Sequence, residues 1–519
     1  MTELPAGWTR AKFSDFGTWV GGGTPSKAVS AYWGGPIPWV SPKDMKTKII
    51  RSAIDGITAD AVEKSAARII PAGSVLIVTR SGILAHTLPI AITAVETTLN
   101  QDLKALTLSD GIDPEFIAMG LHAFEQSILN DCRKGGTTVH SIEMPSLNAF
   151  ELPIPPTNEQ RRIVEKIEAM FERIDKGVES LRAAKTTLAL YRQSLLKSAF
   201  EGRLTADWRA QNADSLEDPK TLLARIQEER DTRYKTALDT WQTALAEWRD
   251  GGEKGKKPAK PKRQKDIAPQ HITLDALPDI TSEWGNLRLG ELNVTVSDGP
   301  FGSNLKTSDY TASGVQVIRL ENIGYGQFLA EKQSFISQEK YKTISHHTVY
   351  PGTIVVSSFV TDAVRSCLVP DSVPYAINKA DCFAVVLDGA QSSRQFLAYY
   401  LQSPQVFKQL EGLIHGVGRP RINTTQLKEV HYPICSSAEQ AEITRILDAR
   451  LDAADKMDAE IDATLIRAEA LRQSILKQAF AGKLVPQDPT DEPAPTLLAR
   501  IKAERAKAGK NKQRRTAHA

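Results

Sequence analysis

The chain has 519 residues, of which 41% are hydrophobic and 24% are charged, and its formal net charge is +3. This length exceeds what one hydrophobic core organises, so we expect at least two domains, while the small net charge does not by itself indicate a polyanionic partner. Four cysteines without a CxxC pair argue against a disulfide framework or a zinc cluster. The first residues lack an apolar core of signal-peptide length, and no run approaches the roughly 20 apolar residues that span a bilayer, so we expect a cytoplasmic protein.

The first part of the chain is rich in short β-forming runs separated by glycine and proline. Residues 37–40, 74–79 and 102–108 have the composition of strands, and a helix is predicted near 114–130. We therefore place a compact α+β domain at residues 1–150.

The next segment, residues 151–205, is predicted to contain a long helix over residues 159–200. A heptad repeat of apolar residues favours a coiled-coil partner over a lone surface helix. Thr157 and Gln160 have capping-box spacing at the start of this helix, and Gly202 is placed to end it. The apolar residues that recur every seven positions are Ile167, Ile174, Leu181, Leu188 and Leu195.

Residues 206–283 have a different composition. Residues 221–250 are helical in composition, and residues 251–266 form a basic stretch punctuated by glycine and proline, which is typical of a linker. This insert separates two copies of a repeat.

The second half of the chain repeats the first, mostly at an offset of 280 residues. YRQSLLKSAFEGRL, which begins at Tyr191, matches LRQSILKQAFAGKL, which begins at Leu471, and LPIPPTNEQ matches YPICSSAEQ upstream. The repeat predicts a second α+β domain at 284–431 and a second helical segment at 432–485. Ser437 and Gln440 repeat the capping-box spacing, and Gly482 is placed to end the second long helix. Its expected strands are 315–320, 353–359 and 382–388, its expected helix is 394–411, and the expected seam residues of the second long helix are Leu447, Ile461, Leu471 and Ile475.

Residues 486–519 are predicted to be a basic helical tail. TLLARIKAER near its start repeats TLLARIQEER of the insert, and residues 500–519 carry eight Lys or Arg against one Glu. Such a tail is usually solvated, and phosphate contact is the alternative.

These features predict an α+β fold with a pseudo-two-fold internal repeat. Two similar domains are separated by two long helices, which are expected to pair with each other as an antiparallel coiled coil. A generic helical bundle or a homodimeric coiled coil is the alternative, but helices duplicated within one chain can pair without dimerisation.

Common catalytic motifs are absent from the sequence. The Pro155-Pro156 pair serves the helix start rather than an adenine-methyltransferase loop, and the lysine of GPFGSNLKT, from Gly299, is misplaced for a phosphate loop. No HExxH or GxSxG motif is present. We therefore interpret the chain as a recognition protein without catalytic or metal-binding residues.

Four motifs in order carry a resemblance to a known family. GGGTPSKAVSAYWGGPIPWVSPKDM, from Gly21, and DGPFGSNLKTSDYTASGVQVIRLENIG, from Asp298, resemble the openings of target recognition domains in DNA specificity subunits of type I restriction–modification systems. The proline-led helix starts and the two RQS-containing helix ends resemble that family's spacer regions. Cys435 departs from the family's more usual proline-rich turn, and the resemblance leaves out the insert at 231–283.

The resemblance implies a non-catalytic subunit that recognises an asymmetric bipartite site on double-stranded DNA. It also implies two methyltransferase subunits and two restriction–translocase subunits as partners, which would use S-adenosylmethionine, ATP and Mg²⁺. A standalone bipartite DNA-binding regulator, an enzyme with a divergent active site and a structural coiled-coil protein are the alternatives.

Polar and basic residues in the glycine-flanked loops are the candidates for DNA contact, because the backbone can approach closely there. Arg419 and Arg421 are the sharpest, since two guanidiniums suit guanine or phosphate. Plain surface charge is the alternative for each Lys or Arg, and turn hydrogen bonds are the alternative for Thr24 and Ser26. The candidates are Thr24, Ser26, Lys27, Lys43, Arg80, Lys134, Thr137 and Thr138 in the first domain, and Ser303, Asn304, Lys306, Arg319, Asn322, Arg419 and Arg421 in the second.

Overall fold

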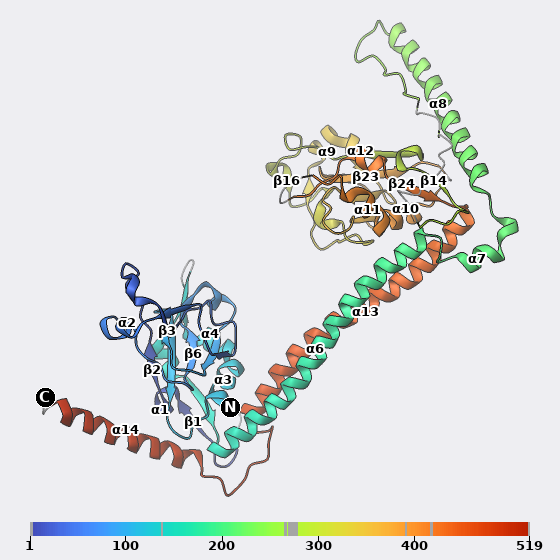
Figure 1. The fold of residues 1–519 in the computed structure, drawn as a ribbon. Coiled ribbons are helices and arrows are strands. Elements are labelled where there is room, and N and C mark those ends of the chain that lie inside the picture. The colour runs from blue at the N-terminus through green and yellow to red at the C-terminus, as the bar shows by residue number, and fades with distance from the viewer. Residues whose placement is uncertain are drawn as a thin grey trace. The chain divides into compact units, whose positions relative to one another are not determined.

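The computed structural model describes residues 4–135, 139–263, 267, 279–389, 392–415 and 419–516, and it divides into two units (Figure 1). Unit 1 holds residues 1–182 and 461–519, and unit 2 holds residues 183–460. Each unit combines one α+β domain with one part of each long helix. The predicted fold class is confirmed.

The ends of the first domain meet, because β1 (Thr9–Lys12) pairs antiparallel with β13 (Glu151–Ile154). Its main sheet has the order β2-β10-β6-β8-β4, and smaller sheets have the orders β5-β3-β9 and β11-β12-β7. The strands are β2 (Gly17–Gly21), β3 (Trp33–Val40), β4 (Ile49–Ile50), β5 (Asp55–Ile57), β6 (Val75–Val78), β7 (Arg80–Ser81), β8 (Ile90–Thr93), β9 (Thr98–Leu99), β10 (Leu103–Leu108), β11 (Arg133–Lys134) and β12 (His140–Ile142). The helices are α1 (Phe13–Phe16), α2 (Ala59–Lys64), α3 (Pro114–Ala123), α4 (Glu125–Cys132) and α5 (Met144–Ala149).

Strand β6 is a continuous apolar run because both faces of the sheet are covered at this strand. Its residues are all buried, and alternate side chains enter different hydrophobic clusters. Val75 and Ile77 pack with the long helices, whereas Leu76 and Val78 pack on the other face of the sheet with Val40 and Leu99. A strand covered on both faces buries every side chain, so it lacks the alternation of a half-exposed strand.

The second domain is built in the same way. Strand β14 (Gly285–Arg288) pairs with β24 (His431–Ile434), and the two further sheets have the orders β15-β23-β20-β21 and β16-β18-β17-β22-β19. The strands are β15 (Val294–Ser297), β16 (Tyr310–Thr311), β17 (Val315–Ile318), β18 (Phe335–Ile336), β19 (Thr348–Val349), β20 (Ile354–Ser357), β21 (Ser366–Leu368), β22 (Ala376–Asn378) and β23 (Cys382–Leu387). The helices are α9 (Gln338–Ile344), α10 (Arg394–Leu401), α11 (Pro404–Glu411) and α12 (Thr424–Lys428).

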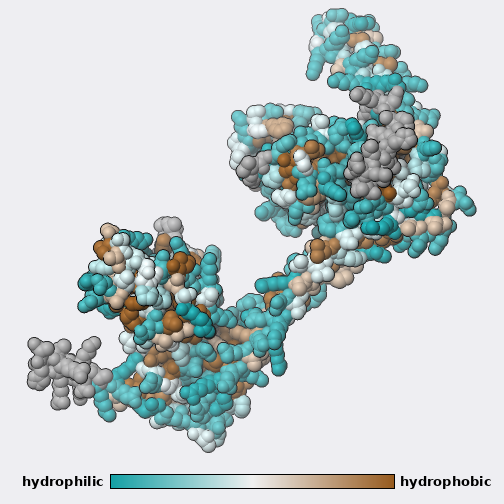
Figure 2. Space-filling view, in the orientation of Figure 1, coloured by the Kyte–Doolittle hydropathy of each residue, from teal (hydrophilic) through white to brown (hydrophobic). Residues whose placement is uncertain are grey.

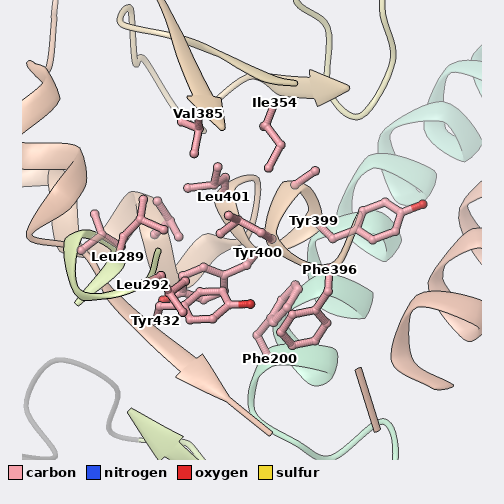
Figure 3. Packing of buried hydrophobic residues seen from close by; sticks show 14 of the residues in the cluster. Phe200, Leu289, Leu292, Ile354, Val385, Phe396, Tyr399, Tyr400, Leu401 and Tyr432 are labelled. Carbon is pink, nitrogen blue, oxygen red and sulfur yellow. The ribbon is translucent and has the colours of Figure 1, made fainter. Parts of the chain in front are cut away.

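The end of the first long helix completes the core of the second domain. The Phe200 ring lies 5.1 Å from the ring centroids of both Phe396 and Tyr400, and Tyr432 packs beside them (Figure 3). All four side chains are fully or almost fully buried. Aromatic residues of this size contribute strongly to core stability, so the helix end and the domain stabilise each other.

The long helices α6 (Thr157–Phe200) and α13 (Ser437–Phe480) lie side by side (Figure 1). In unit 1 Arg472 forms an ion pair with Asp175, and in unit 2 Arg192 Nη2 lies 2.6 Å from Asp455 Oδ1. Within unit 2, Lys185 pairs with Asp458 and Arg192 with Asp455, so residue numbers fall along one helix as they rise along the other and the pairing is antiparallel. The repeat offset exchanges the two aspartates and the two arginines, which makes the ion pairs copies of each other.

The helical seam has one difference from its predicted residues. Leu471 is 50% exposed, so its prediction as a seam residue is wrong. The heptad spacing on α13 runs through Ala468, Arg472 and Ile475, and Leu471 lies one position, about 100° of helix rotation, away from it. Ile167, Leu195, Leu447 and Ile475 are buried, and Ile174, Leu181, Leu188 and Ile461 are half-buried.

The predicted stop signals of both long helices are confirmed. Gly202 and Gly482 have φ values of 77° and 68°, in the left-handed region that favours glycine. The N–H groups of Arg203 and Lys483 reach back to the carbonyls of Ser198 and Gln478, at 3.1 and 2.9 Å.

The glutamines of the predicted capping boxes join each long helix to its domain instead. Gln160 Oε1 accepts from the N–H of Asp113 at 2.8 Å, and Gln440 Oε1 accepts from the N–H of Ser393 at 2.9 Å. Their Nε2 groups donate to the carbonyls of Pro155 and Cys435, at 3.1 and 2.9 Å. The cysteine therefore leaves the geometry of the second helix start unchanged.

The second copy of this joint contains a buried charge network. Glu439 accepts hydrogen bonds from Thr205 Oγ1, Trp284 Nε1 and Arg209 Nε at 2.7, 2.9 and 2.9 Å. Arg209 also bonds Glu283 at 2.6 Å. Burial acts to lower the pKa of the Arg209 guanidinium, but its bond to Glu283 and the charge of Glu439 outweigh this effect and raise it.

Helices outside the repeat domains pack on them through the LLARI segments. Leu222 and Ile226 of α8 (Pro219–Asp250) are buried in the core of unit 2, and Leu497 and Ile501 of α14 (Ala494–Thr516) are buried in that of unit 1. A short helix, α7 (Ala206–Gln211), precedes α8. All four cysteines are free and buried, and none of the helices in the described residues is long and apolar enough to cross a bilayer.

The two equivalent helix-start glutamates give a matched stability prediction. Glu439→Gln leaves the buried Arg209 guanidinium without its Glu439 charge, so we expect a loss of about 2–4 kcal/mol in the stability of unit 2. Burial raises the pKa of Glu159, so ionisation costs stability as the pH rises through that pKa, and Glu159→Gln should change stability by less than about 1 kcal/mol at neutral pH. Amide hydrogen exchange at the starts of α6 and α13 measures both effects. Equal losses of stability in the two variants would contradict the conclusion that Glu439, unlike Glu159, balances a buried charge.

Candidate nucleic-acid interface

In the first domain, two predicted basic residues lie in one row across the sheet β11-β12-β7. Ser141 on the central strand is directly opposite Lys134 on one side and Arg80 on the other. Residues directly opposite each other project from the same face, and two strand spacings separate the outer pair by about 10 Å. Lys134 and Arg80 are exposed, so this row presents two cations to solvent.

The second domain has the same row with different side chains. Arg421, which the repeat offset places on Ser141, bridges to Phe359 on one side and His415 on the other. The Arg421 guanidinium lies 4.6 Å from the centroid of the Phe359 ring, and its Nη1 is 3.3 Å from Asp381 Oδ1. Its side chain remains 45% exposed, so Phe359 and Asp381 orient the guanidinium but leave it accessible to solvent.

A glycine loop lies beside each row. A Cβ at Gly22 would lie 1.9 Å from the Asn100 carbonyl oxygen, and one at Gly299 would lie 2.1 Å from that of Asn378. No other residue fits so close to a neighbouring backbone. These two glycines therefore serve internal packing, whereas the sequence suggested that such loops let the backbone approach DNA.

Hydrogen bonds connect the first glycine loop to the first row. Thr24 Oγ1 bonds to Gln101, and the carbonyl of the next residue, Asp102, accepts from the N–H groups of Thr79 and Arg80 at 2.7 and 3.3 Å. Ser26 and Lys27 are exposed farther along the loop. Lys43 is exposed in the turn that follows β3, whose last carbonyl accepts from the N–H of Asn100 at 2.9 Å.

A half-buried carboxylate makes the corresponding connection in the second domain. Asp298 Oδ1 accepts from the N–H groups of Gly299 and Asp381, at 2.7 and 3.0 Å, and burial raises the pKa of this carboxyl. Asp381 has a φ of 70° and contacts Arg421. The glycine loop, this turn and the arginine therefore form one connected surface. Ser303, Asn304, Lys306 and Arg419 are exposed on the neighbouring loops.

Two predicted residues of the second domain are mainly engaged inside it. Asn322 is 1% exposed, and its amide bonds to the backbone of Arg319, Leu329 and Lys332 at 2.9, 2.9 and 2.8 Å. Arg319 bonds to Ser334 at 3.3 Å and lies 3.3 Å from Glu321. Asn322 therefore holds a loop in place, and Arg319 is only partly available. Thr137 and Thr138 lie outside the described residues.

Sequence reasoning missed Ser141, Phe359 and His415, which complete the two rows. Adding the offset of 280 to Ser141 gives Arg421, so aligning the two copies around the known candidates could have found the central position. The outer positions depend on strand register, which the repeat alone does not reveal.

The interface contains cations, hydroxyls and amides, which can bind phosphates and base edges. Within the described residues, no group of three or more His, Cys, Asp and Glu side chains is arranged to hold a metal ion. Both domains therefore carry side chains of the kinds that nucleic-acid contact requires.

Comparison with known proteins identifies the family. The type I restriction modification DNA specificity domain matches residues 5–180 and 282–465, so it covers both halves of the chain. The chain belongs to the type I restriction–modification DNA specificity family. The predicted resemblance is confirmed.

Individual members of the specificity family differ in how much of the chain they match. The Escherichia coli EcoR124I/EcoR124II specificity subunit is 42% identical over 168 residues, which span 32% of this chain and 42% of that subunit. The E. coli EcoBI specificity subunit is 24% identical over 80% of this chain and 77% of its own length. A solved structure concerning complex assembly and conformational transition of the type I R-M system has a TM-score of 0.60, with 18% identity over 93% of this chain and 100% of that chain, which shows a shared fold.

A pair of glycine substitutions tests the loop packing. Gly299→Ala forces a Cβ against the backbone of residues 378–379, so we expect a loss of about 1–3 kcal/mol in stability and weaker DNA binding. Gly302→Ala is the matched control in the same loop, because nothing lies within 4 Å of its added Cβ. Thermal denaturation and a DNA competition assay measure the two effects. Equal behaviour of the variants would contradict the packing account.

Proposed function

We propose that the chain is the DNA specificity subunit of a type I restriction–modification complex and that each α+β domain reads one half of a bipartite target. The observation that carries this proposal is the equivalent row in the two domains. Lys134, Ser141 and Arg80 occupy it in the first, and His415, Arg421 and Phe359 occupy it in the second. The same position with different side chains suits two half-sites of different sequence.

Within each half-site, most cations would position the duplex and a few would read bases. Arg421 is the strongest candidate for base reading, because Phe359 and Asp381 hold its guanidinium in one orientation while leaving it exposed. Arg80 and Lys134, as flexible exposed cations, suit phosphates. Asn322 would act by holding its loop, since its amide already has partners.

The long helices are proposed to set the number of unread bases between the half-sites. Each is 44 residues long, and the repeat-related ion pairs keep α6 and α13 in one antiparallel register within each unit. Readers that bind major grooves on one face of a duplex require half-site centres about 10 bp apart, or a multiple of this.

Catalysis is proposed to reside in partner subunits that use S-adenosylmethionine, ATP and Mg²⁺. Two methyltransferase subunits would dock on the outer faces of α6 and α13, and two restriction–translocase subunits would complete the complex. Two apolar residues of each LLARI segment are buried in this chain's own cores, so mainly the charged faces of these segments remain for a partner. Co-purification with a methyltransferase subunit separates this function from that of a standalone DNA-binding regulator.

Replacement of Arg421 tests base reading. Arg421→Ala should weaken binding to the target by about 1–3 kcal/mol and relax the sequence preference in one half-site only. Arg445→Ala is the matched control, since this arginine is 68% exposed on α13, where it pairs with Glu442. Competition between target duplexes with single-base changes gives both readouts. Uniform weakening on all duplexes would assign Arg421 to phosphate, and unchanged binding would remove it from the interface.

Exchange of a whole domain tests the division of labour. Residues 1–150 replaced by the corresponding domain of another family member should change one half-site and leave the other half-site and the gap unchanged. The methylation pattern produced together with the methyltransferase subunits reports both. A change in both half-sites would contradict independent reading.

A further inference from the structure

The insert between the two repeats forms an arm, in which helix α8 runs outward and the following segment of chain returns along it. Helix α8 begins against the second domain, where Leu222 and Ile226 are buried, and it continues beyond these contacts to Asp250 (Figure 1). The chain then turns, with positive φ values at Gly252 and Gly255, and residues 256–263 return along the helix. The visible surface near the end of α8 is mostly hydrophilic (Figure 2).

Two tryptophans pin the returning segment to the helix. Trp248 Nε1 donates to the Gly255 carbonyl at 3.4 Å, and Trp241 Nε1 donates to the Pro258 carbonyl at 3.0 Å. Lys257 Nζ lies 5.9 Å from the Trp248 ring centroid, and Lys260 Nζ lies 5.7 Å from that of Trp241. The sequence predicted a linker here, but these contacts hold the segment against the helix, which a free linker would not require.

The pinned segment is strongly basic and exposed. Residues 251–263 carry six Lys or Arg against one Glu, and all six cations are exposed. Arg263 lies 3.2 Å from Asp231 at the base of the arm, whereas the turn and the middle of the segment are dominated by lysine. We call this set the basic rail: Lys254, Lys256, Lys257, Lys260, Lys262 and Arg263.

The composition of the basic rail favours a phosphate backbone over a protein surface. Protein–protein interfaces are depleted in lysine and enriched in aromatic residues. Here the exposed side chains are mostly lysines, and the two tryptophans are used to hold the segment against its own helix. Fixing the cations before binding reduces the entropy lost when they contact an array of charges.

We propose that the basic rail is an accessory DNA-binding site that contacts phosphates without reading bases. It adds affinity for any duplex and leaves the choice of target to the two domains. The inference rests on the proposed DNA-binding function, but the rail lies outside both recognition rows. Loss of the rail should therefore reduce the salt dependence of DNA affinity and leave the sequence preference unchanged.

Neutralisation of three rail lysines in the full chain tests the proposal. The variant carries Lys254→Gln, Lys256→Gln and Lys262→Gln, and binding is measured by fluorescence anisotropy at several salt concentrations. The probes are a duplex that extends well beyond the target and an unrelated duplex of equal length. Because each phosphate contact contributes about 0.9 to the slope of log K against log salt, the slope should fall by about 2–3 on both duplexes, with their affinity ratio unchanged.

A control with the same charge change carries Lys12→Gln, Lys342→Gln and Lys408→Gln, which are exposed lysines outside the rail and both rows. Its slope should stay close to that of the wild type, and an equal fall would reduce the effect to net charge and overturn the proposal. A second variant, Trp241→Phe with Trp248→Phe, keeps every lysine but removes both indole donors. It should weaken binding to both duplexes, and unchanged binding would overturn the role of the pinned conformation.

The remaining outcomes separate the rail from the proposed function. An unchanged slope in the lysine variant overturns the rail, even where the wild type prefers its target. Loss of methyltransferase co-purification with an unchanged slope would make the rail a protein contact and also overturn the proposal. A wild type that binds both duplexes equally would instead contradict the proposed specificity function, while a reduced slope in the variant would still support the rail.

Discussion

The antiparallel pairing of α6 and α13 is the constraint on which the rest of the structure depends. Exposed ion pairs contribute only about 0.2–1 kcal/mol each, so Arg192–Asp455 and Arg472–Asp175 cannot supply most of the pairing energy. The buried seam, with residues such as Ile167 and Ile475, supplies it. The ion pairs add direction and register, because within each unit only one antiparallel alignment of the two helices brings the paired residues together.

Each long helix is joined at its start to the domain that precedes it and at its end to the other domain. The buried glutamines of the two helix starts bond to the N-cap residues of α3 and α10, and the phenylalanine at each helix end enters the core of the other domain. A helix held through backbone hydrogen bonds and buried aromatic rings has little freedom to rotate against its domain. The surface that carries each recognition row is therefore fixed relative to the helix ends within its own unit.

Local sequence patterns predicted most of the elements. Apolar runs located β6, β10, β20 and β23, and the heptads located the first long helix, because these signals depend on neighbouring residues. The repeat located the second long helix. The predicted helices at 114–130 and 394–411 are each divided in two, at Phe124 and at residues 402–403. The errors arose where tertiary contacts decide the outcome, as with the helix-start glutamines that bond to another helix. The prediction of Leu471 as a seam residue was wrong because a polar residue, Arg472, occupies the seam position.

The candidate site was predicted less completely than the fold. The sequence pointed to Arg80, Lys134 and Arg421 individually, but only strand pairing places Arg80 and Lys134 in one row and aligns that row with Arg421. The glycine loops were found for the wrong physical reason, since Gly22 and Gly299 make room for the chain's own backbone. Asn322 was selected as a DNA-contact candidate because it is polar, but it is buried. The burial of a side chain depends on the tertiary fold and cannot be read from neighbouring residues.

The central claim is that one chain carries two unlike readers whose half-sites are separated by a fixed number of unread bases. Selection of bound duplexes from a random-sequence pool, with the chain and its methyltransferase subunits together, tests it most directly. We expect two short blocks of specified bases, different from each other, with a gap of constant length and no preferred sequence. A single contiguous block, or two blocks at variable separation, would contradict it.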